Sequence, residues 1–276
     1  MRNFKNDECK ICKSTNLVIL DQSAQCLNCK VLLYYPYPKQ KKPPKVNFKE
    51  WYRISFDKNI KNFLGMILYT TNKSKVNKSL NILDYGGGSG QFALIYNSLF
   101  PRSKVHIVDI VNESLFNEFK PLNKQIKYEK FPKDKTKFDI IFLNDVYEHV
   151  EDPVNLLTVL RTKLKPAGII FIDTPRQFWI YPFFKYLFKP IYRKIIKGTV
   201  SKSHLQIWSD ESFKKSVQLS NLKIQKISYF SELTMDTDLY LQQMGIKFKP
   251  IKLIIRLFSR PLVSTFYNKI YCVLEK

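Results

Sequence analysis

A glycine-rich loop between two apolar segments is the part of the sequence with the clearest chemical meaning. Asp84 ends a short apolar run, and four of the five residues at 86–90 are glycines. An apolar stretch over 91–99 then leads to Pro101, which predicts a helix that ends before the proline. Glycines let a backbone approach a ligand at a helix N-terminus, so this strand, turn and helix predict a nucleotide-type binding unit.

The spacing of the loop indicates which nucleotide it binds. Dinucleotide sites use G-x-G-x-x-G, with a two-residue gap before the last glycine. Here Asp84, Gly86, Gly88 and Gly90 form Asp-x-Gly-x-Gly-x-Gly, which resembles motif I of class I S-adenosylmethionine (SAM)-dependent methyltransferases. In that family the loop lies beneath the methionine part of SAM, so the resemblance implies that these four residues bind SAM.

Further cofactor contacts are expected where the following strands end. The run Lys104–Asp109 reads as a strand, and Asp109 lies 19 residues after Gly90. A ribose-binding carboxylate is expected about 20 residues after the glycines, although an ordinary strand-end turn acid is the alternative. Glu129 follows a third strand and is a candidate contact for adenine or ribose. Asn144 ends a fourth strand and, with Asp145, would border the methionine end.

The catalytic candidates follow the strand Phe138–Asn144. Asp145, Glu148 and His149 resemble the Glu-x-x-Glu-His of ubiquinone-pathway O-methyltransferases, where these groups are associated with a divalent ion. Asp145 replaces the first Glu and has a shorter reach. His204 precedes a predicted helix, at a place where related enzymes often carry a histidine beside the active site. The alternatives are that Glu148 and His149 cap the next helix and that His204 is a surface or packing residue.

The cysteines indicate a metal site. Cys9-x-x-Cys12 and Cys26-x-x-Cys29 are two knuckle-type pairs separated by 13 residues, and four thiolates suit tetrahedral Zn²⁺. Such a closed shell predicts a structural ion, with disulfides or buried thiols as alternatives. Cys272 reads as a core thiol. The same layout, followed by Tyr-Pro-Tyr-Pro, resembles the zinc-ribbon start of sugar and polyketide methyltransferases.

Strand and helix patterns alternate from residue 81 onward, which predicts an α/β fold with a mostly parallel sheet and helices on both faces. The methyltransferase resemblance adds a Rossmann-like seven-stranded sheet with an antiparallel last strand. The predicted organisation is a zinc ribbon at 1–38, a Lys/Pro-rich linker at 39–49 and a methyltransferase domain at 50–276 with an aromatic and basic insertion at 176–209.

The net charge of +23 lies mainly outside the SAM half, in residues 1–80 and 177–276. No acid occurs from Thr174 to Ser209, and aromatic residues crowd 178–192. This segment and a second one at 249–260 are basic and apolar, which is typical of segments that lie on an anionic membrane surface. A lid over the acceptor pocket is the other interpretation. The apolar runs are too interrupted to span a bilayer, and no signal peptide is apparent, so we expect a cytoplasmic protein that can sit on the inner membrane face.

These features predict a SAM-dependent methyltransferase that acts on a small-molecule or lipid-linked acceptor through a hydroxyl. Two other classes compete with this reading. In a nucleic-acid methyltransferase, the ribbon and the basic surface would bind phosphates, although no Asn-Pro-Pro-Tyr type motif follows the fourth strand. In a non-catalytic adaptor with the same fold, the ribbon would bind a protein partner. The sequence does not distinguish O-, N- and C-methylation.

Overall fold

The computed structural model describes residues 8–20, 23–36, 48–71, 79–109, 125–129, 135–177, 204–231, 250 and 267–276. The strands of the main sheet are β4 (Asn81–Tyr85), β5 (Lys104–Val108), β6 (Ile126–Glu129), β7 (Phe138–Asn144), β8 (Leu164–Pro175), β10 (Lys223–Phe230) and β11 (Lys269–Glu275). A second, smaller sheet contains β1 (Leu17–Leu20), β2 (Ser23–Cys26), β3 (Leu32–Tyr34) and β9 (Gln206–Ile207). The helices are α1 (Phe48–Thr70), α2 (Gln91–Leu99), α4 (Pro153–Lys163) and α7 (Asp210–Leu219).

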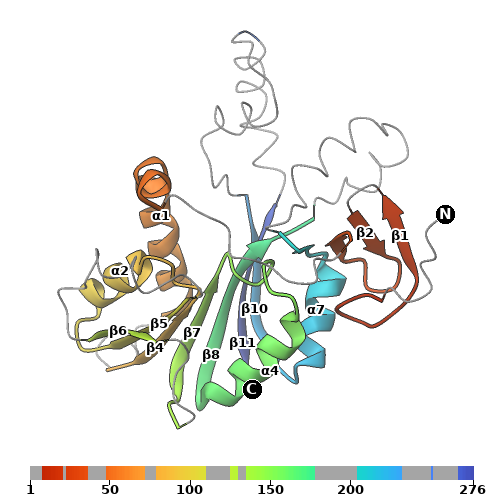
Figure 1. The fold of residues 1–276 in the computed structure, drawn as a ribbon. Helices are drawn as coiled ribbons and strands as arrows, with labels where there is room; N and C mark the ends of the chain where they lie inside the picture. The colour runs from red at the N-terminus through yellow and green to blue at the C-terminus, as the bar shows by residue number, and fades with distance from the viewer. Residues whose placement is uncertain are drawn as a thin grey trace.

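The main sheet has the order β10-β11-β8-β7-β4-β5-β6 (Figure 1). The five strands from β4 to β8 run parallel, whereas β11 is antiparallel to both of its neighbours. The predicted α/β fold with seven strands and an antiparallel last strand is therefore confirmed. The register places Tyr85 opposite Val108 and Asn144 opposite Asp173. The predicted ligand-binding residues therefore lie together at the carboxyl ends of the parallel strands, which form one edge of the sheet.

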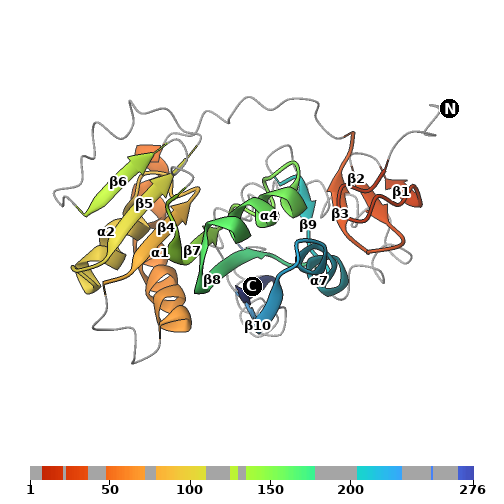
Figure 2. The same ribbon diagram turned by 90° about the horizontal axis from the view of Figure 1, so that it is seen from below.

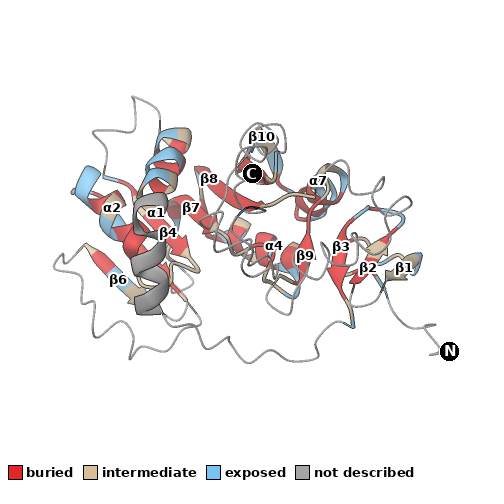
Figure 3. Cartoon of the chain, turned by 90° about the horizontal axis from the view of Figure 1, so that it is seen from above, coloured by how far each residue is buried: buried red, intermediate tan, exposed pale blue. Residues whose placement is uncertain are grey.

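Successive side chains of a strand point to opposite faces of the sheet, so the apolar strands present apolar side chains on both faces. Helices cover both of these faces. In β7, Ile140 and Phe142 pack in one apolar cluster, while Ile141 and Leu143 belong to the other. α1 and α2 cover the first face, and α4 and α7 cover the second. The buried residues of the strands lie between these helices in Figure 3. The small sheet lies beside α7, at the opposite end of the molecule from α1 and α2 (Figures 1 and 2).

Two helix starts follow from local capping chemistry. The Asp152 side chain accepts a hydrogen bond of 2.9 Å from the Asn155 backbone N–H at the start of α4. Asp152 therefore caps α4, and the alternative in which Glu148 and His149 cap this helix is wrong. At the start of α7, Ser209 and Ser212 exchange reciprocal side-chain-to-backbone hydrogen bonds of 3.1 and 2.9 Å.

The structure adds elements that the sequence patterns did not predict. α1 begins at Phe48, inside the predicted linker, and the rest of that linker lies outside the described residues. β9 comes from the predicted insertion at 176–209 and joins the small sheet beside β3. A two-residue strand carries no periodicity of its own, so only its partner reveals it.

No helix in the described parts of the chain is long and apolar enough to cross a membrane. The aromatic and basic segment from 178 to 197 lies outside the described residues, as does all of 249–260 except Pro250. Membrane contact and a lid role for these segments therefore stay predictions.

Candidate active site

The glycine loop connects β4 to α2 through three left-handed residues. Gly86, Gly88 and Gly90 have φ values of +78°, +53° and +82°, which side-chain-bearing residues rarely adopt. The Gly86 N–H donates to the Val108 carbonyl at 2.6 Å, and the Gly90 N–H donates to the Gly87 carbonyl at 2.8 Å. The loop is thus fixed to the end of β5 and turns directly into the first turn of α2.

The three glycines differ in what surrounds them. A Cβ atom on Gly86 would collide with Val146, and one on Gly90 would collide with the Tyr128 hydroxyl. The same atom on Gly88 would meet nothing within 4 Å. Packing therefore requires glycine at two positions, whereas Gly88 faces open space in which a ligand can approach the backbone.

Asp109 lies against this open part of the loop. The Gly88 N–H donates to Oδ2 of Asp109 at 2.7 Å. The predicted ribose-binding carboxylate therefore faces the glycine loop and lies at hydrogen-bonding distance from it.

Asp84 lies beneath the loop and is 2% exposed. Its Oδ2 atom has no hydrogen-bond partner among the described residues. Burial, together with the nearby charge of Asp109, raises the pKa of Asp84 to about 7. A buried polar atom without a partner is uncommon and often marks a place that a bound group completes.

The remaining predicted cofactor contacts are placed by strand register. Glu129 ends β6 opposite Val108, and Asn144 ends β7 opposite Asp173. Both residues thus lie at the same sheet edge as the glycine loop. His106 lies within β5, where its ring makes an edge-to-face contact with Phe138 at a centroid distance of 5.3 Å.

Asp145, which is partly exposed, takes part in an ion-pair cluster around the buried Lys269. Its φ is +49°, and its backbone N–H donates to the Asp173 carbonyl at 3.1 Å. Lys269 donates from Nζ to Oδ1 of Asp145 and to both carboxylate oxygens of Asp173. Although burial opposes a charged ammonium, Asp145 and Asp173 hold the pKa of Lys269 well above its usual range. Lys269 carries no signal in the sequence, because only the register of β11 against β8 brings it to these acids.

The other three catalytic candidates meet in space. One ligand atom from each of Glu148, His149 and His204 lies within 4.8 Å of the other two. His149 Nε2 is 3.7 Å from Glu148 Oε1, and the two imidazole centroids are 4.9 Å apart. Two histidines and a carboxylate at this spacing can exchange protons or bind a divalent ion. Asp145, which was expected in this group, pairs with Lys269 instead.

Glu148 is the buried member of this cluster, with 1% exposure. The Thr174 hydroxyl donates to Glu148 Oε2 at 3.0 Å. Burial and the neighbouring Asp145 carboxylate raise the pKa of Glu148 to about 8, against the opposing effect of Lys269. The side chain therefore holds its proton at neutral pH, whereas His149 and His204 are both partly accessible to solvent.

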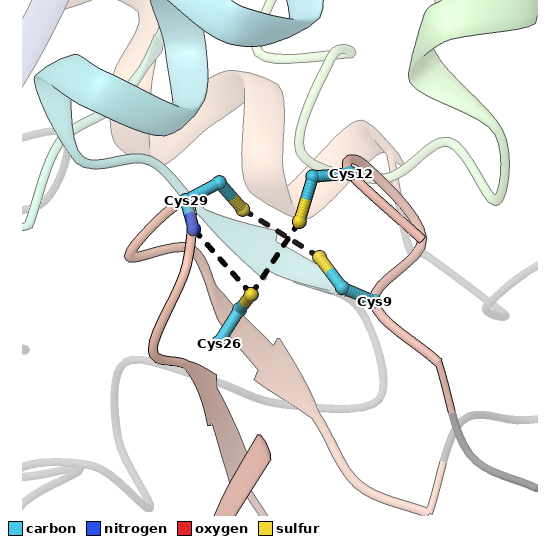
Figure 4. Close-up of side chains that lie close together, drawn as sticks. All are labelled: Cys9, Cys12, Cys26 and Cys29. Carbon is cyan, nitrogen blue, oxygen red and sulfur yellow. Dashed lines mark hydrogen bonds between the residues drawn. The ribbon is translucent and has the colours of Figure 1, made fainter. Parts of the chain in front are cut away.

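The four predicted zinc ligands converge at the edge of the small sheet (Figure 4). Cys9 Sγ is 3.6 Å from Cys29 Sγ, and Cys12 Sγ is 3.6 Å from Cys26 Sγ. A disulfide would need about 2.05 Å, so all four are free thiols. One ligand atom from each cysteine lies within 4.8 Å of the other three.

The two knuckles have the same backbone conformation. Lys13 and Lys30, which follow the second cysteine of each pair, have φ values of +60° and +64°. Their N–H groups donate to the carbonyls of Cys9 and Cys26, both at 2.9 Å. Hydrogen bonding to Cys29 lowers the pKa of Cys9 to about 5, and this contact raises the pKa of Cys29. One thiol of this pair thus ionises readily while its neighbour resists ionisation, and a divalent cation that binds all the thiolates removes this resistance, so the cage fits Zn²⁺.

A family profile described as "Methyltransferase domain" matches residues 20–232. The chain belongs to the methyltransferase-domain family. This match and the sheet order confirm the class I methyltransferase resemblance seen in the glycine loop. Cys9 and Cys12 precede the matched region.

Individual relatives of this methyltransferase domain differ in their acceptors. A malonyl-[acyl-carrier protein] O-methyltransferase from Ilyobacter polytropus is 29% identical over 101 residues, or 34% of this chain and 39% of that protein. A tRNA U34 carboxymethyltransferase from Campylobacter concisus is 32% identical over 102 residues, or 34% of this chain and 35% of that protein. The chain thus covers less than half the length of these curated relatives.

A solved structure supports the fold of the methyltransferase domain. A sarcosine dimethylglycine methyltransferase-type structure from Galdieria sulphuraria superimposes with a TM-score of 0.55 at 14% identity. The superposition covers 79% of this chain and 86% of that one. At this identity, the similarity concerns the fold alone.

Proposed function

We propose that the protein is a SAM-dependent methyltransferase that methylates a hydroxyl on a small-molecule or lipid-linked acceptor. The observation that carries this proposal is the glycine loop of a methyltransferase-family domain. Gly86 and Gly90 are fixed by packing, while Gly88 faces open space beside the Asp109 carboxylate. This is the arrangement that a ligand with a ribose and an amino-acid end needs.

Each residue around the loop has a proposed role in holding SAM. The open backbone at Gly88 lets the amino-acid part lie close to the loop. Asp109 accepts hydrogen bonds from the ribose hydroxyls, and the unpartnered oxygen of Asp84 offers a further acceptor beneath the loop. Glu129 and Asn144 border the cofactor from the ends of β6 and β7. When bound, SAM supplies a methyl group on a sulfonium that is already electrophilic.

The chain's own chemistry is then the removal of the acceptor proton. Glu148 holds its proton at neutral pH, so we assign the general base to the imidazoles of His149 and His204. Their ring centroids are 4.9 Å apart, which allows either ring to take the proton and the other to stabilise the charged form. The remaining task is to hold the acceptor oxygen in line with the methyl group and to exclude water.

The same three side chains offer an alternative role as ligands of a second divalent ion. Sequence resemblance implied Asp145, Glu148 and His149 as its ligands. In the structure Asp145 is bound to Lys269, so the set that remains together is Glu148, His149 and His204. Such an ion would lower the pKa of the acceptor hydroxyl. In the N-terminal ribbon, we assign Cys9, Cys12, Cys26 and Cys29 to a structural Zn²⁺.

Calorimetric titration of the full chain with SAM tests the proposal. Gly88→Arg fills the open space at the loop, and we expect it to abolish SAM binding without unfolding the domain. Gly65→Arg is a matched control, because Gly65 is also a glycine whose Cβ would meet nothing within 4 Å, but it lies in α1. Equal SAM affinity of Gly88→Arg and the control would contradict the assignment of the loop. A wild-type chain that binds no SAM would favour the adaptor alternative.

A nucleic-acid acceptor is the second candidate function. It is favoured by the net charge of +23 and by similarity to a protein named as a tRNA U34 carboxymethyltransferase. Binding to tRNA and to anionic vesicles at the same salt concentration separates the candidates. Tighter binding to vesicles supports a lipid-linked acceptor at a membrane surface, and tighter binding to tRNA supports the nucleic-acid alternative.

A further inference from the structure

The ribbon shares its sheet with the segment that carries His204. β3 pairs with β9 in the register Leu32 to Ile207 and Leu33 to Gln206. The Tyr34 N–H donates to the Leu205 carbonyl at 2.8 Å. The fourth strand of the ribbon sheet therefore begins two residues after a candidate catalytic histidine.

Two side chains next to β9 also bind the second cysteine knuckle, one from Gln177 after β8 and one from Ser209 after β9. Gln177 Nε2 donates to the Lys30 carbonyl at 2.9 Å and to the Ile207 carbonyl at 2.8 Å. Ser209 Oγ donates to the Cys29 carbonyl at 3.3 Å while it caps α7. The knuckle is thus joined to this segment by main-chain pairing and by two side chains.

On its other side, this segment holds the loop that carries Glu148 and His149. The Leu205 and Gln206 N–H groups donate to the Glu148 carbonyl at 2.9 and 3.2 Å. Gln206 Nε2 donates to the Tyr147 carbonyl at 2.8 Å. These contacts fix the distance between His204 and His149 from the ribbon side of the site.

Apolar packing makes the connection continuous. Trp208 is fully buried and stacks on Tyr147, with ring centroids 4.6 Å apart and an interplanar angle of 9°. The apolar cluster that contains both rings also contains residues of the ribbon, among them Cys9, Ile11 and Cys29. The ribbon and the loop after β7 therefore belong to one core, through which a change in the cage can reach the histidines.

We propose that the cysteine cage is a positioning device for the acceptor side of the active site. The metal fixes the second knuckle, the knuckle fixes β9, and β9 sets His204 against His149. This inference rests on the proposed zinc cage and on the proposed role of the two histidines. The SAM loop joins β4 to α2, and α2 lies at the opposite end of the molecule from the ribbon in Figures 1 and 2. Loss of the metal should therefore release His204 and leave SAM binding in place.

The three histidines of the chain allow a direct test by NMR of histidine-labelled protein. His149 and His204 report on the acceptor side, and His106 in β5 is an internal control in the SAM half. We expect a nuclear Overhauser contact between the rings of His149 and His204 in the zinc-bound chain. Removal of zinc with a chelator should abolish this contact, leave the His106 signals unshifted and change the SAM dissociation constant less than twofold.

Gln177→Ala tests the same connection without touching a thiolate. We expect it to weaken the contact between His149 and His204 and to shift the His204 signals, with the zinc-to-protein ratio unchanged. Gln218→Ala, at an exposed position of α7, is the matched control and should shift neither histidine.

Two results would overturn the inference. One is an unchanged contact between His149 and His204 after zinc removal. The other is loss of SAM binding together with that contact, which would show that the metal supports the whole domain. These outcomes are distinct from failure of the proposed function, in which the zinc-bound chain binds no SAM from the start, and from failure of the cage, in which the purified chain contains no zinc.

Discussion

Lys269 donates hydrogen bonds from its buried Nζ to both carboxylate oxygens of Asp173, at 3.0 and 3.1 Å. The pair joins the start of β11 to the end of β8, and a further bond to Asp145 adds the turn after β7. Lys269 is 3% exposed and Asp173 is 1% exposed, so each charge depends on the other for compensation. This cluster holds together β8, β11 and the turn after β7, next to the carboxyl ends of the strands where the candidate active site lies.

Lys269→Met should therefore destabilise the fold strongly. The change leaves the buried Asp173 carboxylate without its cation, and breaking a buried pair from one side costs about 3–5 kcal/mol. Urea unfolding of the full chain measures the loss. Lys223→Met is the control, because Lys223 is exposed in the neighbouring strand β10 and its loss should change the free energy of unfolding by about 0.5 kcal/mol or less. Equal unfolding midpoints for the two variants would contradict the assigned ion pair.

The buried Asp84 should make stability depend on pH in the direction opposite to an ordinary salt-bridged carboxylate. Its pKa is raised from 3.8 in the unfolded chain to about 7 in the fold. Between these values the unfolded chain releases the proton and the fold retains it, so stability falls as pH rises from about 4 to 7 and is constant above. The free energy of unfolding that Asp84 loses over this pH range is on the order of 4 kcal/mol.

Asp84→Asn should remove this dependence. Unfolding free energies at pH 5 and pH 8 should differ less in the variant than in the wild type, because the amide does not titrate. Glu211→Gln, at an exposed position in the first turn of α7, should keep the wild-type slope. Parallel pH profiles for Asp84→Asn and the wild type would show that Asp84 is ionised in the fold throughout this range.

The parts of the site that depend on local patterns were predictable from the sequence. The glycine loop, the strand Phe138–Asn144 and each cysteine pair are local features. The residues that make up each of them are only a few positions apart in the sequence, so their spacing reveals them. The ion pair of Lys269 with Asp145 joins residues 124 positions apart, and His149 meets His204 where the Leu205 and Gln206 N–H groups bind the Glu148 carbonyl. Such contacts depend on strand register between distant segments, which a single sequence does not encode in any periodic pattern.

Gly90 should be required for folding rather than for SAM binding alone. It has a φ of +82°, and a Cβ atom would collide with the Tyr128 hydroxyl, which donates to the Ser89 carbonyl at 2.9 Å. Gly90→Ala should therefore lower the thermal midpoint by more than Gly88→Ala, which has only the backbone cost of about 1–2 kcal/mol. Adding Tyr128→Phe to Gly90→Ala should recover part of the loss. No recovery in the double variant would place the strain in the backbone instead of in this contact.

His149→Gln and His204→Gln should each lower the methyl-transfer rate with SAM and the best hydroxyl acceptor found in a panel of phenols and saccharides. Loss of a general base costs about 10²–10⁴-fold in kcat, while the SAM dissociation constant should stay unchanged because the loop is untouched. His106→Gln is not a suitable control because that ring packs in the core; Gln218→Ala again provides one.

The double histidine variant distinguishes the two proposed roles of the cluster. If the rings act as one proton-transfer unit, the double variant should be little slower than either single variant, because both remove the same step. If they bind a divalent ion with Glu148, the wild type should bind Mn²⁺ and each single variant should lose that binding. Four thiolates are poor ligands for Mn²⁺, so the ribbon should not obscure this measurement. Strictly additive rate losses without Mn²⁺ binding would contradict both roles, because each ring would then act independently of the other.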